Sequence, residues 1–223
     1  MDRRRTMTAA TVALALAATG LLAACNRSTS AASNSATTTA PGSSSGGGST
    51  TSTESPVAPP ESPIAPESNP PGDIPDSIAY VPYRSAPAGL TISTPEGWAR
   101  TNSSTSVQFT DKLNTVLVTW QPASKAPTVT SAKASEVPVI AGSTRAFQIG
   151  TVTSTSLPAG PAVLITYQAN SDPNPVTGKQ YRQDVKRYEL FHNGQEVVLT
   201  LLSPLGADNV DPWRIVTESL KWG

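Results

Sequence analysis

Apolar and polar residues alternate along short segments of the chain from residue 76 onward, which is the pattern of half-buried β-strands. Two such segments, 181–191 and 196–202, flank Asn193-Gly194, a dipeptide that suits the positive φ angles of a type I′ hairpin turn. The second segment is apolar on both of its faces, so each side of the sheet must be covered. The pattern predicts an antiparallel sheet between two covering layers.

Further strands follow from the same alternation and from the turn-forming residues between segments. Strand pairs are predicted at 107–109 with 116–120, around the turn 111–114, and at 145–157 with 162–169, around the turn 158–161. Leu90 and Ile92 precede the turn 95–97, which leads into Trp98, so two short strands are predicted there. Because most strands are joined by short turns, the sheet is expected to be mostly antiparallel.

Two helices can provide the covering layers. The segment 131–141 contains helix-favouring alanines, although Pro138 would limit or kink it. A second helix is predicted from Asp211 as N-cap, with Pro212 at its first position, to the end at Gly223. Its apolar residues at helical spacing are Trp213, Val216 and Leu220. The fold class predicted for 76–223 is therefore α+β, a mostly antiparallel β-sheet with helices packed on its faces.

Residues 89–98, Gly-Leu-Thr-Ile-Ser-Thr-Pro-Glu-Gly-Trp, resemble the opening strand and turn of PsbP-like domains, in which a glycine, an apolar alternation and a Pro-x-x-Trp corner recur. The closing helix, predicted over 211–222, also resembles theirs. The resemblance covers roughly 79–222 and extends to actinobacterial surface lipoproteins with the same α/β/α sandwich. It implies an accessory, assembly or protein-binding role rather than catalysis, and it carries over no metal-binding residue.

The N-terminus has the layout of a bacterial secretory signal. Arg3, Arg4 and Arg5 precede an alanine-rich apolar stretch, 7–24, which contains no ionisable side chain. The stretch ends in Leu-Ala-Ala-Cys at Cys25, which resembles the bacterial lipobox and implies cleavage before Cys25 and lipid attachment to it. The alternative is a retained membrane-spanning helix over the same residues. Either interpretation places the rest of the chain outside the cytoplasmic membrane.

The composition changes sharply after the predicted cleavage site. Serine and threonine make up 17 of the 30 residues from 26 to 55, and prolines then recur among acidic residues as far as Pro75. Such a segment has no apolar face to bury and is expected to remain disordered. We therefore predict a signal peptide over 1–24, a tether over 25–75 and one domain over 76–223. The main interpretation is that the tether is a plain flexible spacer. The alternative is a stalk whose Ser and Thr residues carry O-linked sugars.

Charge and composition exclude several classes of function. From residue 76 onward, 6 Lys and 6 Arg face 6 Asp and 5 Glu, which leaves a net charge of +1 and no basic excess for nucleic acid. His192 is the sole histidine and lies beside the Asn193-Gly194 turn, where an exposed residue is expected rather than a general base. Cys25 is the sole cysteine, so no zinc site of His and Cys ligands is available. We predict no catalytic residue, no metal, no cofactor and no enzyme activity.

One group of residues remains as a candidate partner site. Tyr181, Arg182, Lys186 and Tyr188 bring aromatic and cationic side chains to one predicted strand, and the last three share alternation parity. The main hypothesis is a monomeric domain, anchored to the membrane by the N-terminal lipid on its extracytoplasmic face, that docks on an envelope protein or a wall polymer. The alternative is a carrier for a lipid or another hydrophobic molecule, which would need an apolar pocket of several hundred Å³.

Overall fold

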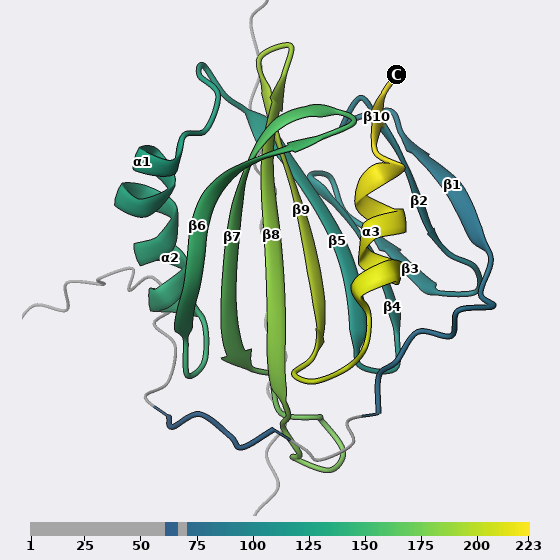
Figure 1. Ribbon diagram of the computed structural model, residues 1–223, viewed down its shortest axis with the longest axis vertical. Coiled ribbons are helices and arrows are strands. Elements are labelled where there is room, and N and C mark those ends of the chain that lie inside the picture. Colours follow the sequence, from purple (N-terminus) through teal and green to yellow (C-terminus); the bar gives the residue numbers. More distant parts are fainter. Residues whose placement is uncertain (1–60, 67–70) are drawn as a thin grey trace, which may run out of the picture. The chain divides into compact units, whose positions relative to one another are not determined.

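The computed structural model describes residues 61–66 and 71–223. Its main element is a seven-stranded antiparallel sheet with the order β3-β4-β5-β9-β8-β7-β6 (Figure 1). In chain order the strands are β3 (Ala99–Asn102), β4 (Ser106–Asp111), β5 (Asn114–Pro122), β6 (Gln148–Leu157), β7 (Gly160–Asn170), β8 (Arg182–His192) and β9 (Gln195–Pro204). The three predicted hairpins are therefore present as β4–β5, β6–β7 and β8–β9.

The turn between β8 and β9 has the predicted conformation. Asn193 and Gly194 both have positive φ angles, 49° and 78°, as a type I′ turn requires. His192 pairs with Gln195 directly beside the turn. This local choice fixes the register of the two long strands at the centre of the sheet, because a one-residue slip would reverse every side chain.

A second, three-stranded sheet has the order β1-β2-β10. It consists of β1 (Tyr80–Ser85), β2 (Leu90–Pro95) and β10 (Lys221–Trp222). The predicted turn at 95–97 is present, with Gly97 at a φ of 81°. The two short strands that it joins, β2 and β3, do not pair with each other, because they belong to different sheets.

The two faces of the large sheet are covered by different elements. Helix α3 (Val210–Glu218) and the small sheet pack on one face, where Val216 and Leu220 join Val118 and Leu199 in one fully buried cluster. On the other face, a helical segment packs on β6 and β7, where Ala132 contacts a cluster around Ile165. This segment consists of α1 (Val129–Ser131), η1 (Ala132–Glu136) and α2 (Val137–Ser143). The α+β fold class is therefore confirmed.

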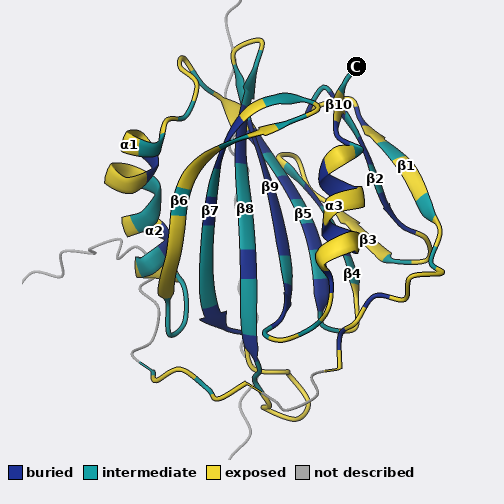
Figure 2. Ribbon diagram, viewed as in Figure 1, coloured by how far each residue is buried: buried dark blue, intermediate teal, exposed yellow. Residues whose placement is uncertain are grey.

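Strand β9 shows why both layers are needed. Residues Val197, Leu199 and Leu201 are buried on the α3 side, and Val198 and Thr200 are buried on the other side. Figure 2 shows buried residues along β5, β8 and β9 and exposed ones along the edge strand β6. Each buried aliphatic side chain contributes roughly 2 kcal/mol to folding, so the centre of the sheet is also the centre of stability.

Pro138 lies in the first turn of α2 and does not end the helical segment. Proline lacks the backbone N–H of a helical residue, so it normally interrupts the hydrogen-bond ladder. Here the turn before it is a π-helix, in which the N–H of Val137 bonds to the carbonyl of Ala132, five residues back. The segment 129–143 is helical from end to end, because the π-helical turn leads directly into α2.

The predicted start and end of the last helix are wrong. Its N-cap is Asn209 rather than Asp211, which lies in the first turn and forms an ion pair with Arg214 at 3.2 Å. The helix ends at Glu218, and the chain then adds β10 to the edge of β2. The main-chain pairing of β10 with β2 replaces further helix at this end, and Leu220 between α3 and β10 is fully buried.

Packing also begins earlier in the chain than residue 76, the predicted start of the domain. Ile74 is buried in the main core, and its N–H donates to the Asn209 side-chain oxygen at 2.8 Å. The carbonyl of Gly72 accepts from the side-chain amides of Asn114 and Asn209. Residues 71–75 therefore belong to the packed unit, because a buried side chain and buried polar groups tie them to α3 and β5. The predicted signal peptide, Cys25 and the tether up to residue 60 lie outside the described residues.

Deletion variants test this boundary. We expect deletion of 26–60 to leave the midpoint of thermal unfolding unchanged, whereas deletion of 26–75 should lower it by roughly 5 °C. The physical reason is the loss of Ile74 burial, about 2 kcal/mol, together with the partners of the Asn209 side chain. Calorimetry on the two variants compares them directly, and equal midpoints would contradict the packing of 71–75.

Candidate functional site

The face of the large sheet that carries α1 and α2 is only partly covered. The helical segment packs on β6 and β7, whereas β4 and β5 present half-exposed polar side chains on the same face. Thr115, Leu117 and Thr119 point to this side, since they pair with Leu202, Thr200 and Val198 of β9. The result is an accessible strip over β4 and β5, which reaches β9 only near its ends, at Glu196 and Leu202.

A cavity of about 810 Å³ opens at one end of this strip. Its floor is formed by Gln108, Thr115, Leu117 and Leu202 from the sheet, and its roof is the loop 171–181 between β7 and β8. Three charged side chains, Lys112, Asp172 and Lys179, lie around it. The cavity thus combines the apolar side chains of Leu117 and Leu202 with amide, hydroxyl and charged groups, as ligand sites commonly do.

The roof of the cavity has a defined conformation. The side-chain oxygen of Asn174 accepts from the backbone N–H groups of Val176 and Thr177, both at 2.9 Å. The backbone of Asn174 is bonded in turn to Lys179 and Gly178, and Gly178 has the positive φ of 66° that the tight turn requires. The loop is therefore exposed but closed by its own hydrogen bonds, and it lies beside the cavity.

Tyr181 joins this roof to the sheet. Its hydroxyl donates to the carbonyl of Leu113 and accepts from the side-chain amide of Gln183, each at 3.1 Å. Burial raises the pKa of Tyr181 above its usual value of 10.0, and the bond from Gln183 lowers it only in part. The phenol therefore stays neutral and bridges β8 to the turn after β4. Of the four predicted partner residues, Tyr181 is the one that lines the cavity.

Arg182 is buried rather than available to a partner. It is 4% exposed, and its guanidinium donates to the carbonyl of Ala146 at 2.8 Å and to the side chains of Asn170 and Gln148. Burial lowers the pKa of Arg182 below its usual value. The prediction assumed an exposed strand, but β8 lies between β7 and β9 inside the sheet.

Lys186 and Tyr188 face the side of α3, away from the cavity. They share this face with Arg182, as their parity predicted, because they pair with Leu201 and Leu199 of β9. Tyr188 is half-buried against the main core, and its pKa is raised by burial. The four predicted residues therefore do not form one surface. The cavity is formed by other residues, the polar side chains of β4, β5 and β8. These side chains lie close together because of the strand order in the sheet.

The accessible strip continues beyond the cavity toward the other end of β5. A second hollow of about 400 Å³ is lined there by Thr119, Gln121, Glu136, Arg187 and Glu196. The side-chain amide of Gln121 donates to the Glu196 carboxylate at 2.7 Å. Leu117 lines the first cavity and Thr119 lines the second hollow, and the two residues are neighbours on the same face of β5. The two hollows therefore adjoin along this strand, and together they are called the elongated polar surface.

A buried carboxylate lies beside the second hollow. The side chain of Glu189 has no exposed surface, and its Oε1 accepts from the guanidinium of Arg187 at 3.1 Å. Its Oε2 has no hydrogen-bond partner within the described part of the chain. Burial raises the pKa of Glu189 from its ordinary 4.5, and nearby Glu136 and Glu196 raise it further, while Arg187 lowers it in part.

This burial gives an expected pH dependence. A carboxyl whose pKa is higher in the folded state than in the unfolded state stabilises the fold fully at pH values below its unfolded pKa, here 4.5. This stabilisation is lost as the pH rises through the pKa of the folded state. Glu189→Gln keeps the neutral form at every pH, so the variant should gain stability relative to the wild-type chain as pH rises from 4.5. Urea denaturation across this range measures the difference. The exposed Glu218→Gln is the control, and identical curves for the Glu189 variant would refute the assignment.

Other chemistry-bearing residues take structural positions. His192 stacks on Trp222, with ring centroids 4.6 Å apart and an interplanar angle of 8°. Over 61–66 and 71–223, no group of three or more His, Cys, Asp or Glu side chains is placed to hold a metal ion. Within the same ranges, no helix has the length and apolar character needed to cross a bilayer.

No protein-family model matches the chain, and no curated protein sequence matches it. Solved structures with a similar fold exist at low identity. Cyanobacterial PsbP from Synechocystis sp. PCC 6803 is 12% identical with a TM-score of 0.49, over 68% of this chain and 98% of that protein. LpqN, a protein involved in cell envelope biogenesis of Mycobacterium tuberculosis, is 16% identical with a TM-score of 0.39, over 66% of this chain and 91% of LpqN.

A crystal structure from Bacteroides thetaiotaomicron is 9% identical with a TM-score of 0.44. The match covers 64% of this chain and 48% of the Bacteroides protein, so this chain spans about half the length of that relative. At these identities the likeness extends to the fold alone. The two sheets and their covering helices form an α+β sandwich, the fold class that the sequence predicted.

Proposed function

We propose that this protein is a lipid-anchored cell-envelope lipoprotein whose domain is a non-enzymatic module that binds a hydroxyl-rich wall polymer. The observation that carries the proposal is the elongated polar surface over β4 and β5, with its cavity of about 810 Å³. Such a surface suits a long ligand that lies along the strands. The lipobox-like sequence at Cys25 and the predicted tether supply the anchoring part of the proposal.

The side chains of the cavity suit a ligand rich in hydroxyl groups. Gln108, Gln180 and Gln183 carry amides that both donate and accept, as a hydroxyl group also does. Leu117 and Leu202 supply apolar floor against which the C–H faces of sugar rings can pack. This mixture of amides and small apolar patches supports a polysaccharide more than a lipid.

The ionisable groups around the cavity support binding rather than catalysis. Asp172 is the carboxylate among its lining residues, and it forms an ion pair with Arg145 at 3.3 Å. General acid–base hydrolysis of a glycosidic bond ordinarily needs two carboxylates across the ligand, and this lining supplies one.

The alternative function, a lipid carrier, would need an apolar chamber between the sheet and a helix. The space between the sheet and α3 is occupied by side chains that are almost completely buried: Leu90, Leu199, Leu201, Trp213 and Val216. The open cavity, in turn, is bordered by Lys112, Lys179 and glutamines, which would disfavour an acyl chain. These features favour docking over lipid carriage.

Cosedimentation with purified actinobacterial cell-wall polysaccharide tests the proposal. Leu117→Arg places a long cation on the cavity floor and should weaken binding roughly tenfold, an effect of about 1.4 kcal/mol. Val139→Arg makes the same change at a position on α2 that is 67% exposed and should bind like the wild-type chain. Equal binding by both variants would refute the site. Binding to envelope proteins alone, or a copurifying lipid, would refute the polymer as ligand.

A further inference from the structure

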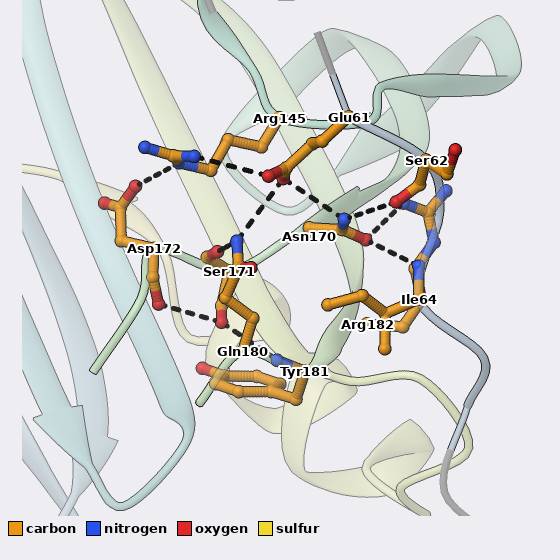
Figure 3. A network of polar contacts seen from close by, with 10 residues as sticks. All are labelled: Glu61, Ser62, Ile64, Arg145, Asn170, Ser171, Asp172, Gln180, Tyr181 and Arg182. Carbon is orange, nitrogen blue, oxygen red and sulfur yellow. Dashed lines mark hydrogen bonds and ion pairs between the residues drawn. The ribbon is translucent and has the colours of Figure 1, made fainter. Parts of the chain in front are cut away.

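A short segment from the predicted tether, 61–66, is seated on the domain at one end of the large sheet (Figure 3). The carboxylate of Glu61 contacts three side chains that come from distant parts of the chain. Arg145 lies 3.4 Å from its Oε2, and the amides of Asn170 and Gln180 donate to its Oε1 at 3.1 and 3.3 Å. The Glu61 side chain is 22% exposed, so this acidic group is largely enclosed.

Asn170 also binds the backbone of the segment. Its side-chain nitrogen donates to the carbonyl of Ser62 at 2.9 Å, and its oxygen accepts from the N–H of Ile64 at 3.1 Å. The two peptide groups lie on either side of Pro63, so one amide holds the main chain across the proline. Such contacts need an extended peptide but no particular side chain at residue 64.

The site is rigid because its central amide is fixed from behind. Asn170 is 5% exposed, and the buried guanidinium of Arg182 donates to the same oxygen that accepts from Ile64, at 3.1 Å. With Glu61, Ser62 and Ile64 bound, both donors and both acceptor positions of the Asn170 amide are used. Without the segment, three of these four would lose their partner. Arg182, predicted as a partner residue, is therefore a positioning residue for this amide.

The bound sequence occurs twice in the chain. Residues 61–66 read Glu-Ser-Pro-Ile-Ala-Pro, and residues 54–59 read Glu-Ser-Pro-Val-Ala-Pro, seven positions earlier. The two copies differ only in Val57 and Ile64. Every group that the site contacts, namely the glutamate and the two peptide groups around the proline, is present in both copies.

We propose that Arg145, Asn170 and Gln180 form a binding site for an extended acidic Glu-Ser-Pro peptide, occupied by residues 61–66 and able to take residues 54–59 in their place. Proline restricts the unbound peptide to extended conformations, which lowers the entropy cost of binding. Exchange of the two copies shifts the attachment point of the tether by seven residues. This inference is argued from the contacts of residues 61–66 and not from the proposed polymer binding, although Gln180 lies at both sites.

Reversal of the glutamate charge in one or both copies tests the site. The measurement is the rate of amide hydrogen exchange, observed by NMR on the detergent-solubilised full chain. Glu61→Lys places a second cation against Arg145, so the Ile64 amide should lose its protection, roughly fivefold for one hydrogen bond. The Val57 amide should gain protection at the same time, because residues 54–59 replace the displaced copy. In the double variant Glu54→Lys/Glu61→Lys, both amides should exchange freely. Glu67→Lys, outside both copies, is the matched control and should resemble the wild-type chain.

Two results would overturn the proposal. One is equal exchange of the Ile64 amide in the wild-type chain and the double variant. The other is a Val57 amide that stays unprotected in Glu61→Lys, which would show that the site does not accept the repeated sequence. A synthetic peptide of residues 61–66, added at millimolar concentration to the double variant, should shift the side-chain amide signals of Asn170, and a scrambled peptide should not. Equal shifts with both peptides would also contradict the site.

Discussion

Replacement of Asn209 by alanine is expected to destabilise the domain by about 3 kcal/mol. Asn209 is 2% exposed, and its side chain accepts from the N–H of Ile74 and donates to Gly72 and Asn114. In the variant the N–H of Ile74 and the side-chain oxygen of Asn114 would be buried without a partner, and each such group costs roughly 1–3 kcal/mol. The loss would fall on the junction between the N-terminal segment, β5 and α3.

Urea denaturation measures this change as a lower midpoint at an unchanged slope. The matched control is Asn102→Ala on β3, where the side chain is exposed and its contact is a 3.4 Å bond from the hydroxyl of Tyr83. That variant should stay within about 0.5 kcal/mol of the wild-type chain. A similarly small effect at Asn209 would show that the three buried contacts do not hold the N-terminal segment.

The second large effect is expected at Cys25. If the lipobox-like sequence directs acylation, Cys25→Ala should abolish lipid attachment and move the protein from the membrane fraction to the soluble fraction. The reason is that the proposed anchor is the lipid, and no helix within 61–66 and 71–223 is long and apolar enough to cross a bilayer. Fractionation and mass spectrometry of the N-terminal peptide measure both parts.

Ser28→Ala, three residues beyond Cys25, is the control and should remain acylated. Continued membrane retention of the Cys25 variant, without acylation, would contradict the lipoprotein proposal. It would support the alternative, a retained spanning helix over 7–24.

The features that the sequence predicted well are local. The Asn193-Gly194 turn needs only its own two φ angles, and the strands beside it follow from alternation over a few residues. The apolar stripe of the last helix likewise predicted the burial of Trp213 and Val216. In each case the residues that determine the structure are neighbours in the chain.

The features that it missed depend on contacts between distant residues. Arginine is a residue type common in binding sites, yet Arg182 is buried. Its guanidinium finds hydrogen-bond acceptors in the carbonyl of Ala146 and the side-chain oxygen of Asn170. The contacts of Asn209 were not predicted, because its partners Ile74 and Gly72 lie 135 and 137 residues away in the chain. Alternation cannot identify such pairs, because the acceptors are backbone groups and amides of segments that look unstructured in sequence.

The cavity was missed for a related reason. Gln108, Thr115 and Gln183 lie on three strands, and each is an ordinary polar residue in an alternating segment. They come together because of the strand order, in which β9 lies between β5 and β8. The sequence predicted the hairpins but not this order, so it predicted Tyr181 as a site residue without its true neighbours.

NMR titration of the isotope-labelled full chain with fragments of actinobacterial wall polysaccharide tests the central claim most directly. The amide signals expected to shift belong to the cavity and its roof, at Gln108, Thr115, Leu117, Gln180 and Gln183. Signals of α3 and of the exposed strand β3 should stay in place. Saturable shifts confined to the cavity would support a polymer-binding module. Absence of any shift, or shifts spread over the face of α3, would contradict it.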